Sequence, residues 1–406
     1  MATTAILVAG TFDTKSTELN FIADQIKAAG VAVKTVDLSA TTGHVSTADA
    51  TPQDIAKFHP NGTDAVFTGD RGTAVSGMAQ AFAIWIKEQS DSIGGIISAG
   101  GSGGTALATP AMQALPIGLP KVMVSTVASG NVEPYVGPSD IMMLYSVTDV
   151  QGVNAISRKV LGNAATAIAG MAKFGADTSP QGEEKPGVGL TMFGVTTAAV
   201  QAVVDQIDTR FEPFVFHATG VGGRSMEKLA DGGFFDAVID LTTTEVCDMM
   251  FGGVFPATKD RFGAIIRQKM PYVGSVGALD MVNFGAPGTV PEQHKDRLFY
   301  EHNPQVTLMR TTPDENAQMG KWIAERLNEM TGPVRFLLPE GGVSALDAEG
   351  MPFYDPDALA ALFAAIRETF AETENRKLLS VPHNLNTPEF ASSAVAALND
   401  MIGQDA

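Results

Sequence analysis

The residues best suited to chemistry lie in a glycine-rich run in the first half of the chain, residues 98–105 (SAGGSGGT). The run follows an apolar segment typical of a buried strand and opens a segment with a helical pattern. Four glycines in five residues let the backbone curl so that its N–H groups converge on an anion. A helix start adds free N–H groups and a positive dipole end. The predicted phosphate-binding residues are Gly100, Gly101, Ser102, Gly103, Gly104 and Thr105.

The same run fits two other motifs. Gly101-x-Gly103-x-x-Ala106 matches the dinucleotide fingerprint, which needs an acidic residue about 20 positions later to hold a ribose. Residues 92–132 contain no acid, so the sequence argues against NAD or a flavin. Gly100-x-Ser102-x-Gly104 also matches a nucleophile elbow, in which Ser102 would act with a later Asp and with His302 or His383. A serine hydrolase is therefore the less favoured alternative.

A second loop, residues 10–16 (GTFDTKS), joins the first apolar strand to a helix expected from Ser16. Its lysine could reach a phosphate and its acid could meet Mg²⁺, although the glycine that precedes the lysine in a P-loop is missing. The structural alternative is a helix cap with a solvated lysine. This loop adds four candidate nucleotide-binding residues, Thr11, Asp13, Thr14 and Lys15, with Asp13 as the possible magnesium ligand.

Two further loops are predicted at the same edge, because ligands collect at the carboxyl ends of parallel strands. Residues 68–73 follow a strand expected at 65–67 and carry Arg71, which could clamp a phosphate. The structural alternative is that Arg71 is a surface arginine in a turn. Residues 125–131 offer hydroxyl and amide donors, and the candidates there are Ser125, Thr126 and Gly130.

The second half carries another glycine turn, residues 217–224 (HATGVGGR), placed like the first-half run. His217 or His302 with Glu245 could perform general acid–base chemistry, since histidine titrates near neutral pH. Structural roles, including a helix cap at residues 242–245, are equally compatible, and a metal site from both histidines and an acid has no diagnostic spacing. The candidate substrate-binding residues are Arg224, Asp280, Asn283, Asn303 and Glu340.

The arrangement of apolar and helical segments predicts an α/β fold with two doubly wound, mainly parallel sheets. A polar stretch rich in Pro and Gly, residues 174–187, separates a nucleotide-binding domain at 1–180 from a second domain at 188–406. The two are expected to face each other across a cleft. Residues 378–402 supply one more strand and helix, which the sequence assigns to neither domain.

Composition narrows the class of protein. The net charge of −18 and the pI near 4.7 argue against binding to nucleic acid or an anionic membrane. The single cysteine, Cys247, excludes an internal disulfide framework and a multi-cysteine structural zinc site. Two uncharged stretches, 92–120 and 186–204, are broken by Gly, Pro, Ser and Thr and predict buried elements rather than membrane spans. A cytoplasmic protein is expected.

These motifs together resemble the family of the tomato mosaic virus resistance protein's ATP-binding domain and its uncharacterised bacterial and fungal relatives. The matching runs include GTFDTK at 10–15, SAGGSGGT at 98–105, HATGVGGRSMEKL at 217–229, DLTTTEVCD at 240–248 and PEGGVSALDAEGMPFYDP at 339–356. The resemblance implies two Rossmann-like subdomains, Mg-ATP bound by the first, and a homodimer. In the plant member a barrel related to phosphoenolpyruvate hydrolases follows, so a separate barrel partner is a further expectation.

The functional prediction is an ATP- and Mg²⁺-binding protein that acts on a small anionic metabolite in the interdomain cleft. The alternative is a regulatory or interaction module that nucleotide stabilises without turnover.

Overall fold

The computed structural model describes residues 4–41, 43–175 and 185–403. The chain divides into two compact units, Met1–Gly182 and Glu183–Ala406. Most of the stretch interpreted as a linker, residues 174–187, lies outside the described residues. The expected cleft between the domains stays a prediction, and each unit is described by itself.

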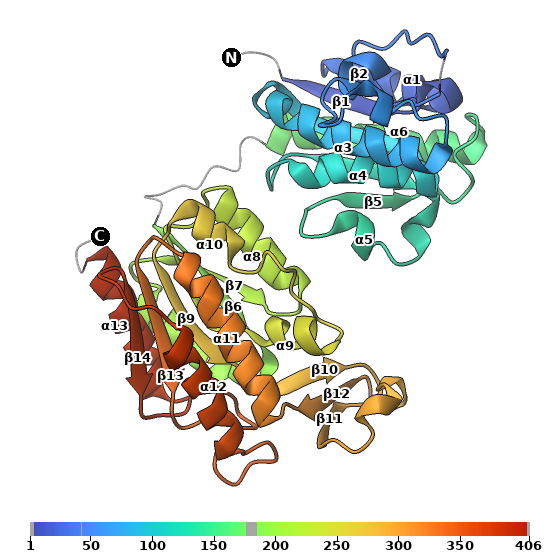
Figure 1. The fold of residues 1–406 in the computed structure, drawn as a ribbon. Coiled ribbons are helices and arrows are strands. Elements are labelled where there is room, and N and C mark those ends of the chain that lie inside the picture. The colour runs from blue at the N-terminus through green and yellow to red at the C-terminus, as the bar shows by residue number, and fades with distance from the viewer. Residues whose placement is uncertain (1–3, 42, 176–184, 404–406) are drawn as a thin grey trace. The chain divides into compact units, whose positions relative to one another are not determined.

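The N-terminal unit contains a parallel five-stranded sheet with the order β2-β1-β3-β4-β5 (Figure 1). Its strands are β1 (Ala5–Gly10), β2 (Val33–Asp37), β3 (Ile93–Gly100), β4 (Lys121–Ser125) and β5 (Met142–Tyr145). The chain leaves β1 toward β2 and then returns to the other side of β1 to form β3. The order therefore reverses between β1 and β3, which is where open α/β sheets bind ligands.

Helices cover both faces of this sheet. They are α1 (Phe12–Ala28), α2 (Pro52–Ala56), α3 (Arg71–Gln89), α4 (Ser102–Ala114), α5 (Glu133–Val136) and α6 (Ala155–Phe174). Helices α1 and α6 pack their apolar residues on one face, and α3 and α4 pack theirs on the other. Because both faces are buried, the central strands are apolar at almost every position.

Three local predictions in this unit were wrong. Residues 65–67 form no strand; a 3-10 turn, Thr63–Ala65, occupies this place, and Val66 packs beneath α3. Helix α3 passes so close that a Cβ on Gly77 would lie 2.3 Å from the Ala65 carbonyl oxygen. Helix α1 begins at Phe12, before the start expected at Ser16, and helix α4 begins at Ser102, before the start expected near Thr105. The expected start of α1 coincides with a kink at Lys15, where φ is −128° and ψ is 18°.

The C-terminal unit contains a parallel six-stranded sheet with the order β14-β13-β9-β8-β6-β7. Its strands are β6 (Gly187–Met192), β7 (Glu212–His217), β8 (Ala237–Thr242), β9 (Tyr272–Gly277), β13 (Val334–Pro339) and β14 (Arg376–Val381). A small antiparallel sheet, which the sequence did not predict, has the order β10-β12-β11. It consists of β10 (Met281–Phe284), β11 (Phe299–Asn303) and β12 (Val306–Arg310).

The helices of this unit also form two layers (Figure 1). They are α7 (Thr197–Ile207), α8 (Val221–Asp231), α9 (Thr244–Phe251), α10 (Gly263–Gln268), α11 (Pro313–Glu329), α12 (Pro356–Thr369) and α13 (Pro388–Ile402). Helices α7 and α13 pack together on one face, while α8, α10, α11 and α12 contribute to the core on the other. The last strand and helix, left unassigned from the sequence, thus belong to this unit.

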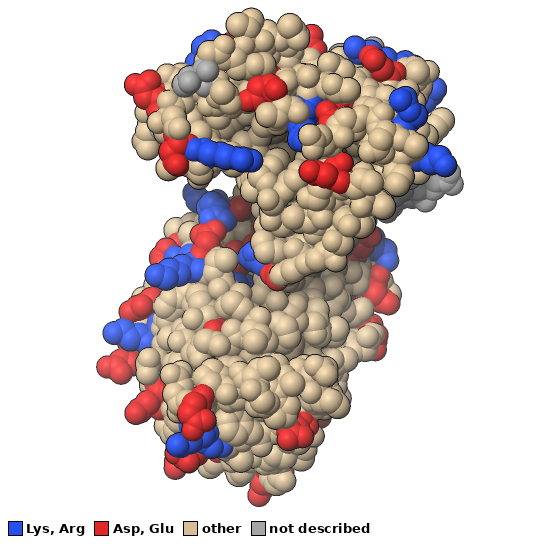
Figure 2. All heavy atoms as spheres, turned by 90° about the vertical axis from the view of Figure 1, so that its right-hand side faces the viewer, with Lys and Arg blue, Asp and Glu red and all other residues tan. Residues whose placement is uncertain are grey.

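The predicted α/β class with two parallel sheets is confirmed. On the face drawn in Figure 2, acidic and basic side chains are interspersed. Among the helices that the structure describes, none is long and apolar enough to cross a bilayer.

Candidate functional site

A cavity of about 580 Å³ opens at the carboxyl ends of β1 and β3, where the strand order of the N-terminal sheet reverses. Its walls come from the starts of α1, α3 and α4, from the loop after β2 and from Asp149 after β5. The predicted residues that line it are Thr11, Asp13, Thr14, Lys15, Arg71, Gly100, Gly101, Ser102, Gly103 and Gly104. Three of the four predicted loops thus meet at one edge of the sheet.

The start of α4 faces the cavity without a side-chain cap. Gly101 is its N-cap residue and has no side chain to cap the helix, and among the described residues no side chain accepts a hydrogen bond from the first turn. A Cβ on Gly103 would lie 3.8 Å from Nη2 of Arg71, so the guanidinium group lies beside the glycine turn. Free N–H groups at a helix start next to an arginine form an anion-binding arrangement.

The start of α1 differs, because its N–H groups already have partners. Gly10 and Asp37 pair in the β1–β2 register, which brings the end of β2 beside the helix. Phe12 N donates to Asp37 Oδ1 at 3.2 Å, and Asp13 N donates to Ser39 Oγ at 3.0 Å. Burial raises the pKa of Asp37, but hydrogen bonds, chiefly from Ser39, outweigh burial and hold that pKa below its usual value. An internal carboxylate therefore occupies this helix start.

Two charged side chains of α1 line the cavity with different contacts. Asp13 Oδ2 accepts a hydrogen bond from Thr41 Oγ1 at 2.7 Å, whereas Asp13 Oδ1 is buried and has no partner among the described residues. The Lys15 ammonium group donates to the backbone carbonyl of Val150. The lysine expected to reach a phosphate is thus bonded to the loop after β5.

The remaining predicted nucleotide-binding residues do not line the cavity: Thr105, Ser125, Thr126 and Gly130. Thr105 Oγ1 lies 2.6 Å from Ser125 Oγ and donates to the Gly101 carbonyl at 2.8 Å. Both hydroxyls are buried, and their hydrogen bonds stabilise the glycine turn. The sequence analysis also missed three polar lining residues, Thr41, Asp70 and Asp149. Thr41 and Asp149 each follow a strand, and that position could have indicated them.

The glycine turn of the C-terminal unit contains an internal carboxylate. Gly220 N and Gly223 N donate to Glu245 Oε1 at 2.6 and 3.0 Å. Glu245 is completely buried, and a Cβ on Gly223 would lie 2.0 Å from its Oε2. The anion that this turn binds is therefore part of the chain itself.

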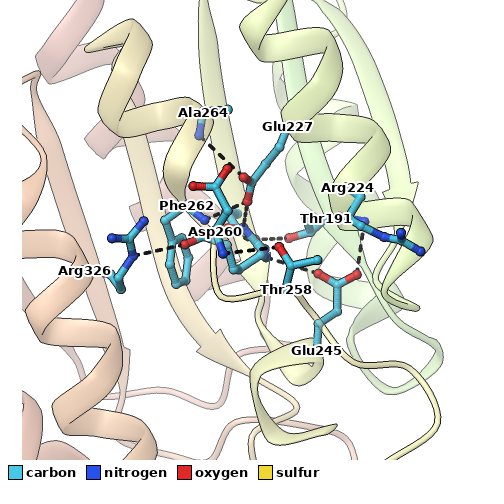
Figure 3. Close-up of polar contacts among 12 residues, drawn as sticks. Thr191, Arg224, Glu227, Glu245, Thr258, Asp260, Phe262, Ala264 and Arg326 are labelled. Atoms are coloured by element: carbon cyan, nitrogen blue, oxygen red, sulfur yellow. Dashed lines mark hydrogen bonds and ion pairs between the residues drawn. The ribbon is translucent and has the colours of Figure 1, made fainter. Parts of the chain in front are cut away.

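Glu245 belongs to a buried cluster centred on Arg261, and Figure 3 shows two of its carboxylates, those of Glu227 and Glu245. Arg261 donates to Glu245 Oε2 at 3.1 Å, to Glu227 Oε1 at 3.1 Å and to Asp240 Oδ1 at 2.9 Å. Burial raises the pKa of Glu227 and of Glu245, and the positive charge of Arg261 opposes this effect. With its oxygens engaged, Glu245 has a structural environment rather than that of the acid–base residue expected from the sequence.

The two histidines of the expected catalytic set lie on different strands. His217 is exposed at the end of β7, and its ring stacks on Phe193 with centroids 5.3 Å apart. His302 and Asn303 are exposed on β11, an edge strand of the antiparallel sheet. In the described part of the chain, no hydrogen bond or ion pair joins His302 to His217 or Glu245.

The expected substrate-binding residues contact the protein itself. Asp280 is fully buried and accepts a hydrogen bond from Ser344 Oγ at 2.7 Å; burial and the neighbouring Asp347 raise its pKa to about 7. Asn283 Nδ2 donates to Asp248 Oδ1 at 3.2 Å. Arg224 Nε donates to the Gly220 carbonyl at 3.3 Å, and exposed Glu340 pairs with Arg367.

Both parts of the chain match models of one family. Residues 4–177 match the N-terminal domain and residues 185–402 the C-terminal domain of an uncharacterised protein family, UPF0261. A UPF0261 protein of Mesorhizobium japonicum is 55% identical, over 97% of this chain and 98% of that protein. The ToMV resistance protein Tm-1 of Solanum lycopersicum is 42% identical, over 95% of this chain and 54% of that protein. The resemblance predicted from the motifs is confirmed.

Among solved structures, a Streptomyces glycosyltransferase complexed with thymidine diphosphate aligns with a TM-score of 0.18 and 10% identity, over 67% of this chain and 81% of that chain. This likeness is too weak to indicate a shared fold.

Proposed function

The chain belongs to the UPF0261 family, and we propose that its N-terminal unit binds a magnesium nucleoside triphosphate in the cavity between the ends of β1 and β3. The observation that supports this proposal most strongly is the uncapped start of α4 beside Arg71. The volume of about 580 Å³ falls in the range of small-molecule sites. The resemblance to an ATP-binding domain supports ATP as the nucleotide.

The phosphates would bind at α4 rather than at α1. The first N–H groups of α1 donate to Asp37 and Ser39, so they are not available to a ligand. Among the residues that the structure describes, no side chain acts as such an acceptor at the start of α4, and Arg71 adds a guanidinium group that pairs well with phosphate oxygens.

The charges of the cavity favour a nucleotide that arrives with Mg²⁺. The lining contains three carboxylates, of Asp13, Asp70 and Asp149, and two cations, of Lys15 and Arg71, a net charge of −1. A bare triphosphate would be repelled, whereas a bound cation offsets this repulsion. The unpartnered Asp13 Oδ1 suits a magnesium ligand. Since no group of three or more His, Cys, Asp or Glu among the described residues could hold a metal, phosphate and water would supply the other ligands.

The serine-hydrolase alternative has no support at this cavity, because no histidine is among the described residues that line it with Ser102. The homodimer and the barrel partner implied by the resemblance remain proposals; sedimentation of the full chain tests the first.

Calorimetry of the full chain with Mg²⁺ and the nonhydrolysable ATP analogue adenylyl imidodiphosphate tests the nucleotide site. We expect Gly103→Val to weaken binding at least about 100-fold, because the side chain would occupy the anion position. Folding should survive, since a Cβ at Gly103 meets only Arg71 Nη2, at 3.8 Å.

The matched control is Gly162→Val on α6, where a Cβ has no neighbour within 4 Å. Its affinity should equal that of the wild-type protein. Absence of binding by the wild-type protein, or binding by Gly103→Val within twofold of it, would refute the proposal. Release of phosphate from ATP, measured in parallel, separates an enzyme from a module that nucleotide only stabilises.

A further inference from the structure

The segment that follows β2 holds the backbone at the start of α1. Asp37, completely buried at the end of β2, accepts hydrogen bonds from Phe12 N at 3.2 Å and from Ser39 N at 2.9 Å. Ser39 Oγ donates to Asp37 and accepts from Asp13 N. The position of Asp13 is therefore set by a chain of buried polar contacts from a different element.

The next polar residue of this segment engages the Asp13 side chain. Thr41 is exposed, lines the same cavity as Asp13, and donates from Oγ1 to Asp13 Oδ2 at 2.7 Å. Hydrogen bonds to an ionised carboxylate are among the stronger ones, so this contact restrains rotation of the carboxylate. The other oxygen, Oδ1, is buried and accepts nothing from the described residues.

We infer that Thr41 is a positioning residue that makes Asp13 a one-oxygen ligand and thereby selects Mg²⁺ over Ca²⁺ at the proposed nucleotide site. Mg²⁺ requires near-octahedral geometry and keeps several waters, which single carboxylate oxygens and phosphates satisfy, whereas Ca²⁺ accepts bidentate carboxylates and more ligands. With Oδ2 held by Thr41, bidentate coordination by Asp13 is disfavoured. This inference rests on the proposed function.

Thr41→Val tests the inference by removing the hydroxyl donor while keeping the branched shape. In calorimetric titrations with adenylyl imidodiphosphate, we expect the half-saturating Mg²⁺ concentration to rise about 10-fold and the preference for Mg²⁺ over Ca²⁺ to narrow by a similar factor. Affinity for the nucleotide in excess EDTA should not change, because Thr41 acts through the metal. Thr41→Ser should restore the wild-type values within about twofold.

Two further variants separate positioning from general damage. Thr35→Val removes a comparable hydroxyl-to-carboxylate bond on β2, from Thr35 Oγ1 to Asp49 Oδ2 at 2.8 Å, outside the cavity wall, and should leave metal dependence unchanged. Asp13→Asn should make the affinity for the nucleotide depend less on Mg²⁺. The double variant Asp13→Asn with Thr41→Val should show the same dependence on Mg²⁺ as Asp13→Asn alone. Thermal unfolding of each variant reports its folding.

The outcomes distinguish the two levels of the proposal. If wild-type protein fails to bind the analogue with Mg²⁺, the nucleotide site itself is wrong. If it binds, and Thr41→Val either matches Thr35→Val or weakens binding equally in EDTA, the nucleotide site stands and the role of Thr41 is overturned. Mn²⁺ electron paramagnetic resonance of the complex gives a second readout, since an unchanged spectrum in Thr41→Val also contradicts the inference.

Discussion

The two glycine-rich turns of this chain have similar sequences and opposite surroundings. In the N-terminal unit the turn before α4 lines a cavity of about 580 Å³ with its helix start uncapped. In the C-terminal unit the N–H groups of Gly220 and Gly223 hold the carboxylate of Glu245. A glycine turn after a buried strand can thus be filled by a carboxylate of the protein itself, and its sequence does not distinguish that case from a turn that lines an open cavity.

The difference arises from side chains that lie outside the two turns. In the C-terminal unit the loop between α9 and α10 carries Arg261 into the core, where it bonds to Glu245, Glu227 and Asp240. This arginine offsets the cost of burying the carboxylate that the turn binds. In the N-terminal unit the arginine beside the glycine turn, Arg71, is exposed at the cavity wall, so its charge remains accessible to a ligand.

The same substitution in both turns gives the largest expected contrast. Gly223→Ala would place a Cβ 2.0 Å from Glu245 Oε2, and we expect it to lower the free energy of unfolding of the C-terminal unit by at least about 3 kcal/mol. Gly103→Ala meets only a contact at 3.8 Å and should stay within about 1 kcal/mol of wild type. Urea unfolding measures the change in free energy of unfolding for both variants. Equal losses of stability would mean that side chains of the protein fill the two turns equally.

Stability should depend on pH differently in the two units. Burial is the first cause that raises the pKa of Asp248 and Asp280 to about 7 and of Asp347 to about 6, all in the C-terminal unit. A raised pKa means that the folded state holds the proton more tightly than the unfolded state. The contribution of these groups to the free energy of unfolding is therefore complete below about pH 4 and is lost as pH rises through 6 to 7. In the N-terminal unit Asp37, Asp49 and Asp140 have lowered pKa values, and their contribution is lost only as pH falls below about 4.

Between pH 5 and 8 the free energy of unfolding of the C-terminal unit should therefore fall by several kcal/mol, and that of the N-terminal unit by less than about 1 kcal/mol. The chain has two tryptophans, Trp85 on α3 and Trp322 on α11, one in each unit. Single-tryptophan variants, Trp85→Phe and Trp322→Phe, allow fluorescence to follow each unit separately. If the unfolding transitions of the two units shift equally with pH, the predicted difference between the units is wrong.

The smallest expected effect compares the arginines beside the two turns. Arg71→Ala should weaken binding of the magnesium nucleotide about 10-fold, because one charge-assisted contact is lost. Arg224→Ala should leave that affinity within twofold, since Arg224 lies by a turn whose anion is Glu245. Calorimetry measures the nucleotide affinity of both variants. A larger loss of affinity in Arg224→Ala than in Arg71→Ala would indicate that the ligand binds the C-terminal unit instead.

Local sequence patterns predicted most of the fold because apolar runs become buried strands wherever helices cover both faces of a sheet. They failed for β11, whose residues are almost all exposed and so form no apolar run. They failed also at residues 65–67, where a short apolar run packs beneath α3 instead of joining the sheet.

The candidate site was predictable where one turn supplies its own chemistry, as at Gly100–Gly104 beside Arg71. It was not predictable where distant residues take up the donors and acceptors. Asp37 fills the start of α1 from 25 residues away, Lys15 bonds to Val150 across 135 residues, and Arg261 reaches Glu245 from 16. No local spacing encodes such pairs, and they decide which helix start and which side chains remain available.

The close approach of Gly223 to Glu245 also restricts how this turn can change over evolutionary time. Any side chain at position 223 overlaps the carboxylate, so a replacement there survives only in a chain whose residue 245 has already become smaller. Loss of the Glu245 carboxylate in turn leaves Arg261 with fewer partners, which disfavours that first step. The two positions are thus expected to vary together across relatives, in a fixed order, whereas packing ties Gly103 to no partner residue in this way.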